Sequence, residues 1–253
     1  MGQPQEAEQI AARVLKSDRT SVGAAILVGQ ALFAMNRAAD AIAPLQAVAR
    51  LGADPRVETL LAAALGAAGR SNDALDQLQL TTSRRPPFLP AFLEYCGQLQ
   101  RAGRIDEAIS VAESALGLMP ACIDLRLAIA RLLVMRNDRV RARAVLLEAQ
   151  TAAPRRPDVQ AELARVMVLD GEYSAAADIF RRALALQPGD AMTRTNLASC
   201  LLELGERSSA ELQLREAVRA QPHLVGRAIA SMASASHGRF FMRPSAAAKF
   251  FQG

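Results

Sequence analysis

Apolar residues recur along this chain with the spacing of helices, in short stretches that polar turns separate. One kind of stretch places them at positions i, i+1 and i+4, as at Leu163, Ala164 and Met167. The stretch that follows keeps an apolar stripe at i and i+3, as at Phe180 and Ala183. Spacings of three and four residues put side chains on one face of an α-helix, whereas a strand would alternate. The pattern therefore predicts an all-α protein made of short helices, each with one buried face.

The stretches form a repeat, because three sets of residues recur in phase. Glycine or asparagine ends the first stretch of each repeat, at intervals of 33 and then four times 34 residues: Asn36, Gly69, Gly103, Asn137, Gly171 and Gly205. Alanine follows five residues later each time: Ala41, Ala74, Ala108, Ala142, Ala176 and Ala210. Proline closes five of the repeats: Pro86, Pro120, Pro154, Pro188 and Pro222.

Each set has a physical role in a helix–turn–helix unit. Glycine and asparagine enter the left-handed backbone region at low cost, so they end the first helix. Proline cannot continue a helix, so it marks the end of the second. We expect the alanines where two helices cross too closely for a larger side chain. The sequence therefore predicts a tandem array of helix pairs.

This pattern resembles the tetratricopeptide-repeat (TPR) family, and the clearest repeat is 157–190. The resemblance implies an α-solenoid, a right-handed TPR superhelix of helix-turn-helix repeats. It covers residues 22–224 as six repeats: 22–54, 55–88, 89–122, 123–156, 157–190 and 191–224. Two features depart from the family pattern. The first aromatic position is aromatic only at Phe92, and elsewhere holds Ala25, Glu58, Arg126, Gln160 and Arg194. The first repeat also carries Pro44 inside its second helix, where we expect the helix to bend.

The two ends of the chain are expected to cap the array, because a solenoid needs to shield its open faces. Residues 4–17 read as one helix with a single apolar face, so we interpret 1–21 as an N-terminal cap. Residues 225–253 should form a C-terminal capping helix and a tail rich in phenylalanine. The tail residues Phe240, Phe241, Phe250 and Phe251 either cover the last repeat or form a docking tail for self-association or a partner.

The composition of the chain indicates its source and its cellular location. The net charge is +5, and of 30 basic residues only Lys16 and Lys249 are lysine, which indicates a GC-rich genome. No stretch is apolar over the ~20 residues that a membrane helix needs, and no secretory signal is recognised at the N-terminus. We therefore expect a bacterial, cytoplasmic protein that does not insert into membranes.

Catalytic motifs and ligand clusters are not found in the sequence. The two histidines, His223 and His237, have no second metal ligand at helical spacing. Phosphate-binding glycine loops and nucleophile motifs are missing as well. The cysteines Cys96, Cys122 and Cys200 are far apart, so we interpret them as core thiols. We expect no catalytic residue, no cofactor and no metal.

The TPR resemblance implies that the first helix of each repeat lines a concave groove. The residues that we assign to a partner-binding groove are Arg101, Leu127, Arg131, Val134, Met135, Arg165, Val168, Leu169, Asn196 and Leu202. Because Arg131 and Arg165 are 34 residues apart, we expect them to face one groove. Aliphatic walls with two guanidinium groups suit a peptide or helix that has apolar anchors and an acidic or C-terminal carboxylate. The alternative is that these arginines pair within the wall, with Asp124, Asp158 or Glu162.

The leading functional hypothesis is a non-catalytic protein–protein interaction scaffold. One alternative is an accessory targeting region linked to an enzyme such as a sulfotransferase, since bacterial TPR arrays are often fused to enzyme domains. Another is RNA or DNA binding through arginine clusters, among them Arg84-Arg85, Arg136, Arg139, Arg141, Arg143, Arg155-Arg156 and Arg181-Arg182. Aromatic side chains for base stacking are nearly absent from these clusters, which makes a nucleic-acid partner the weaker hypothesis.

Overall fold

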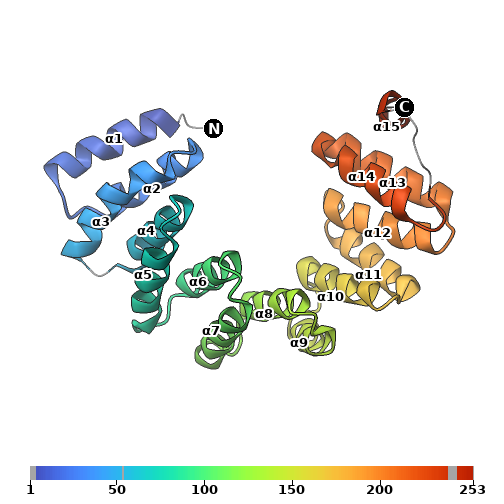
Figure 1. Cartoon of the computed structure of the whole chain (residues 1–253), viewed down its shortest axis with the longest axis horizontal. Coiled ribbons are helices and arrows are strands. Elements are labelled where there is room, and N and C mark those ends of the chain that lie inside the picture. The colour runs from blue at the N-terminus through green and yellow to red at the C-terminus, as the bar shows by residue number, and fades with distance from the viewer. Residues whose placement is uncertain (1–3, 53, 239–243, 253) are drawn as a thin grey trace. The chain divides into compact units, whose positions relative to one another are not determined.

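The computed structural model describes residues 4–52, 54–238 and 244–252 (Figure 1). These residues form fifteen α-helices and two short 3-10 helices, and no β-strand occurs among them. The chain divides into two compact units, Met1–Arg136 and Asn137–Gly253. The all-α repeat fold predicted from the sequence is therefore confirmed. The boundary between the units falls inside the fourth expected repeat, between its two helices.

The helices of the N-terminal unit are α1 (Pro4–Ser17), α2 (Val22–Ala34), η1 (Ala38–Ala41), α3 (Ile42–Leu51), α4 (Pro55–Ala67), α5 (Ser71–Ser83), α6 (Leu89–Arg101), α7 (Ile105–Leu118) and α8 (Ile123–Met135). Those of the C-terminal unit are α9 (Arg139–Ala152), α10 (Pro157–Leu169), α11 (Tyr173–Leu186), α12 (Ala191–Glu203), α13 (Arg207–Ala220), η2 (Pro222–Leu224), α14 (Val225–Ser234) and α15 (Pro244–Gln252). Within each unit, each helix packs on the next, as α4 does on α5 and α10 does on α11.

All six turn residues that the repeat singled out have positive φ. The angles are 56° at Asn36, 79° at Gly69, 74° at Gly103, 63° at Asn137, 78° at Gly171 and 80° at Gly205. The six crossing alanines are all 0% exposed, as expected where two helices approach closely. Left-handed turns and small crossing residues thus define the helix pairs.

We expect replacement of the turn glycine Gly103 by alanine to lower the free energy of unfolding by about 1 kcal/mol. A Cβ added there would meet nothing within 4 Å, so the cost comes from the positive φ alone. Gly117 provides the matched control, because it lies inside α7 with equally open surroundings. Gly117→Ala should instead stabilise the protein, by up to about 1 kcal/mol. Urea unfolding followed by circular dichroism measures both, and equal effects of the two variants would contradict the assignment.

Polar residues replace the family's aromatic in three successive repeats and make the same contact. The side chains of Arg126, Gln160 and Arg194 each donate to the carbonyl oxygen of the proline six residues earlier, at 2.6, 2.8 and 2.8 Å. That proline closes the preceding second helix, which leaves carbonyl groups without an intrahelical partner. The departure from the family pattern therefore joins each repeat to the one before it.

Glu58 holds the same place in the second repeat but bonds differently. Its carboxylate is buried, with a side-chain exposure of 3%, and accepts two hydrogen bonds from Arg84 at 2.6 and 2.8 Å. Arg84 directly follows α5, so this ion pair joins the start of the repeat to its end. The carboxylate raises the pKa of the Arg84 guanidinium.

Pro44 accompanies the bend that the sequence predicted. The second helix of the first repeat is broken into the 3-10 helix η1 and the short helix α3, and Pro44 lies in the first turn of α3. Because proline lacks an N–H and restricts the residue before it, an uninterrupted α-helix is disfavoured here. Pro44 also lines the pocket that is described below.

The C-terminal helices α14 and α15 pack against α13. Phe251 is 5% exposed, and the Arg215 guanidinium lies 4.3 Å above the centre of the Phe250 ring. These two phenylalanines therefore contact the chain's own last helices. Phe240 and Phe241 lie outside the described residues.

Candidate functional site

The first helices of the repeats carry the residues assigned to the groove, and the N-terminal unit contains five of them. Arg101 is exposed and pairs with Glu94 at 2.9 Å. Met135 is 53% exposed and Val134 is half-buried, so both offer apolar surface. Leu127, however, is only 4% exposed. Its assignment to the groove surface is wrong, because it packs in the core between helices.

Arg131 is exposed on α8, where the sequence placed it. It belongs to the N-terminal unit and Arg165 to the C-terminal unit. The alignment of the two guanidinium groups in one groove therefore stays a prediction.

The C-terminal unit contains the other five groove residues. Leu169 is 51% exposed at the end of α10, and Val168 beside it is half-buried. Leu202 is 0% exposed, so it belongs to the core and its assignment to the groove surface is also wrong. Arg165 pairs with Glu162 at 2.7 Å, which is the pairing within the wall that the sequence left as an alternative. Asn196 accepts a hydrogen bond from Arg227 at 3.1 Å.

A row of polar contacts joins α12 to α14 and to Ser236 just beyond it, and sequence reasoning missed it. Besides the Asn196 contact, Ser199 donates to Ser231 at 3.3 Å and Ser236 donates to Glu203 at 3.0 Å. The partners are 31 to 33 residues apart, close to the repeat length. That spacing was a signal for polar pairing between successive first helices. This end of the wall is consequently polar, whereas α10 offers aliphatic surface.

Most of the arginine clusters are bound by carboxylates. Arg136 pairs with Asp106 at 3.0 Å, and Arg139 pairs with Asp170 at 3.2 Å. Five further arginines that the sequence grouped with them are paired as well: Arg84, Arg141, Arg143, Arg156 and Arg181. Ion pairing lowers the positive potential that a phosphate backbone would meet. The clusters thus serve mainly to connect neighbouring turns and helices.

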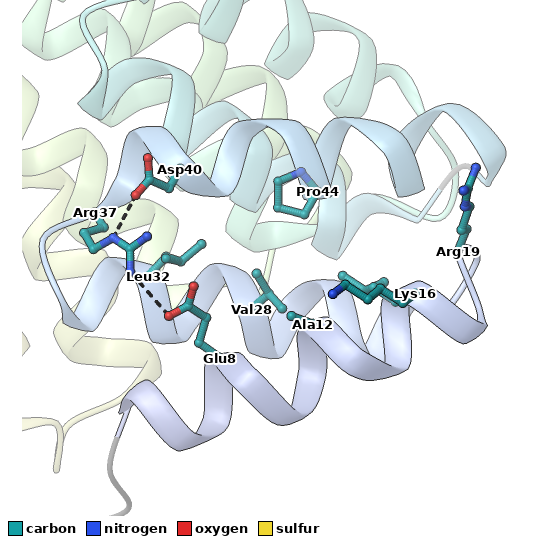
Figure 2. A pocket seen from close by; sticks show the side chains of 10 residues that line it. Glu8, Ala12, Lys16, Arg19, Val28, Leu32, Arg37, Asp40 and Pro44 are labelled. Atoms are coloured by element: carbon teal, nitrogen blue, oxygen red, sulfur yellow. Dashed lines mark hydrogen bonds and ion pairs between the residues drawn. The ribbon is translucent and has the colours of Figure 1, made fainter.

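A pocket of about 440 Å³ opens between α1, α2 and the η1–α3 segment (Figure 2). Its floor contains Val28 and Leu32 from α2, and Pro44 lines the opposite side from Ala12. Charged side chains surround the floor. The sequence did not predict this pocket, although Pro44 marked the place as a departure from the repeat.

Two of the three thiols are buried. Cys96 and Cys200 are buried, and burial raises the pKa of each thiol to about 11. Cys122 is half-buried just before α8. Since the thiolate is the reactive form, buried thiols with raised pKa values are poor nucleophiles.

We expect only Cys122 to react promptly with Ellman's reagent in the native protein at neutral pH. Cys96 and Cys200 should react at the rate of unfolding, and in urea all three should react together. Because folding raises both pKa values from 9.0 to about 11, the two thiols should also lower stability progressively as the pH rises through that range. Prompt reaction of all three thiols at neutral pH would contradict their burial.

The part of the chain that the structure describes contains no group of three or more histidine, cysteine or acidic residues that could hold a metal ion. Among the same residues, no helix is both long enough and apolar enough to cross a membrane.

Known structures share this fold at low sequence identity. A thermophilic TPR protein of Thermus thermophilus, TTC0263, is 23% identical and aligns over 78% of this chain and 100% of its own, with a TM-score of 0.56. Human IFIT1, solved as a dimer with m7Gppp-AAAA, is 13% identical over 92% of this chain and 60% of its own, with a TM-score of 0.65. A chain of the APC/C hetero-tetramer Cut9–Hcn1 is 16% identical and aligns over 99% of this chain and 52% of its own, with a TM-score of 0.62. Comparison with curated proteins found no match.

A model of the family described as Tetratricopeptide repeat matches residues 1–64, 99–166 and 167–233, which together make up more than half of the chain. Its first match includes α1. Helix pairs, positive-φ turns and crossing alanines all agree with this match. The chain belongs to the tetratricopeptide-repeat family.

Proposed function

We propose that the protein is a non-catalytic interaction scaffold that binds a peptide or helical segment of a partner protein on the wall formed by the first helices of its repeats. The observation that carries this proposal is exposed aliphatic surface beside an arginine on these helices. Met135 follows Arg131 by one turn on α8, and Leu169 follows Arg165 by one turn on α10. Met135 and Leu169 are about half exposed. Single exposed apolar residues are ordinary on a protein surface, so the proposal rests on the arginine that stands one turn before each of these two side chains.

The partner's chemistry follows from these groups. Apolar side chains anchor on Met135 or Leu169, and an acidic side chain or a C-terminal carboxylate pairs with the neighbouring arginine. Arg165 would then exchange Glu162 for the partner's carboxylate. The Arg165 side chain is exposed but that of Glu162 is only 14% exposed, so the partner's carboxylate has to compete with this pair within the wall. The apolar anchors accordingly supply most of the affinity. In this proposal the protein acts in the cytoplasm.

The two alternative functions receive less support. Human IFIT1 was solved with m7Gppp-AAAA, but the paired arginines of this chain argue against nucleic-acid binding here. An enzyme-linked targeting role remains compatible with the same wall, with catalysis supplied by another chain. For the tail, contact of Phe250 and Phe251 with the C-terminal helices favours capping over self-association.

Affinity capture from a lysate of the source cells tests the proposal. We expect Arg131→Glu or Arg165→Glu to reduce recovery of a specific partner roughly tenfold or more relative to wild type. Arg182→Glu is the control, because it makes the same charge change on the second helix α11. Equal loss with the control variant, or recovery that nuclease treatment abolishes, would contradict the proposal.

A further inference from the structure

The pocket between α1, α2 and the η1–α3 segment combines an apolar floor with ion-paired charges at one end and two cations, Lys16 and Arg19, at the other (Figure 2). Val28 and Leu32 are 4% and 2% exposed, so the floor consists of well-packed side chains. The small side chain of Ala12 and the rigid ring of Pro44 line its two sides. A volume of about 440 Å³ is within the range of ligand pockets and accommodates one or two large side chains.

The end of the pocket near the η1 helix is electrostatically satisfied. Arg37 donates to Asp40 at 2.7 Å and to Glu8 at 3.4 Å, so one cation is shared between two carboxylates. Figure 2 shows these three side chains together at one side of the pocket. A charged group of a ligand would therefore gain little binding energy at this end of the pocket.

The opposite end is positive. Lys16 and Arg19 line it, and among the described residues neither has an ion-pair partner. The nearby carboxylate of Asp18 accepts from the N–H and the hydroxyl of Thr20, at 2.9 and 2.7 Å. Two exposed cations therefore remain at the rim, beside the apolar floor.

An equivalent pocket one repeat further along the chain differs in charge. It lies over Leu61 and Leu65, which follow Val28 and Leu32 by 33 residues, and has a volume of about 300 Å³. Arg50 and Arg70 line it together with three carboxylates, whereas the first pocket has three cations and two carboxylates. The carboxylates of the second pocket are Glu58, Asp73 and Asp76. An acidic ligand would thus distinguish two pockets that the repeat makes alike in position.

We propose that the pocket between α1 and α3 binds a segment of a partner protein in which acidic residues lie next to a large apolar side chain. The apolar side chain lies on Val28 and Leu32 and is flanked by Pro44, which has no N–H to satisfy. The acidic residues reach Lys16 and Arg19. This site is separate from the wall of first helices, and it can hold a second region of the same partner or a different protein.

A tryptophan peptide tests this directly, because the chain contains no tryptophan. The probe is acetyl-Gly-Trp-Glu-Glu-Glu-amide, and its neutral match carries glutamine in place of each glutamate. Fluorescence anisotropy of the peptide, measured against increasing protein, reports binding. We expect the acidic peptide to bind roughly tenfold more tightly than the neutral one at low salt, and this difference should shrink at 0.5 M salt.

Substitutions then locate the site on α1. Lys16→Glu/Arg19→Glu should remove the preference for the acidic peptide, whereas Arg13→Glu should leave it, because Arg13 is exposed on the same helix outside the pocket. Ala12→Phe should weaken both peptides by filling the cavity. The proposal would be overturned by equal binding of the two peptides, by no measurable binding of either, or by a preference that survives Lys16→Glu/Arg19→Glu. A concentration-dependent dimer that the peptide cannot displace would also overturn it, by assigning the pocket to a second copy of the chain.

Discussion

Replacing Phe180 by alanine is expected to lower the free energy of unfolding of the C-terminal unit by about 4 kcal/mol. Phe180 is 0% exposed in α11, the second helix of the repeat that best matches the family. Removing the ring loses its burial and leaves a cavity that the neighbouring helices α10 and α12 cannot fill without moving. Because each repeat is stabilised by its neighbours, the loss should spread through the unit as one cooperative change.

Urea unfolding monitored by circular dichroism measures this effect, with Leu212→Ala as the control. Leu212 is 54% exposed on α13, so its truncation should change stability by less than about 0.5 kcal/mol. Similar effects of the two substitutions would contradict the assignment of Phe180 to the core.

Removing Arg84 should be the most damaging charge substitution in the N-terminal unit. Arg84→Ala leaves the Glu58 carboxylate buried without its guanidinium partner, and loss of such a partner costs about 3 kcal/mol. Arg84 itself is 40% exposed, so water can reach part of the vacated space and the upper range of such penalties is not expected.

The double variant Glu58→Phe/Arg84→Ala separates the charge from the packing. It restores the aromatic residue that the family has at this place, and replacing a buried pair by apolar side chains is often neutral or stabilising. We therefore expect it to recover most of the stability lost in Arg84→Ala, as measured by thermal unfolding. A double variant that is less stable than Arg84→Ala would show that Glu58 contributes through packing or other contacts rather than through the pair.

The repeat could be predicted because its determinants are local. A turn that needs positive φ selects glycine or asparagine, and a close helix crossing selects alanine. The roles of Gly103 and Ala108 could therefore be predicted from the sequence alone. The bend at Pro44 follows from the same local logic. Contacts between elements are different, because they depend on which side chains two helices bring together. In the sequence Glu58 stood out only as a residue in place of the family's aromatic. Its ion pair with Arg84, 26 residues away, could be seen only in the folded structure.

Exposure at the wall was the least predictable property. Leu127 and Leu202 occupy positions that the family resemblance assigns to the groove, yet both are buried by neighbouring helices. Position within a repeat determines which helix face a residue occupies, but small differences in helix packing decide whether its side chain reaches the surface. Met135 and Leu169, at the ends of their helices, keep about half of their surface exposed.

Oxidative footprinting of the complex with the captured partner tests the central claim, which is that the first helices bind the partner. Hydroxyl radicals modify exposed Met135 and Leu169 on the first helices, and equally exposed Leu147 and Leu212 on the second helices α9 and α13. We predict that binding protects Met135, Leu169 or both, and leaves Leu147 and Leu212 as reactive as in the free protein. Protection of Leu147 and Leu212 with unchanged oxidation of Met135 and Leu169 would contradict the account.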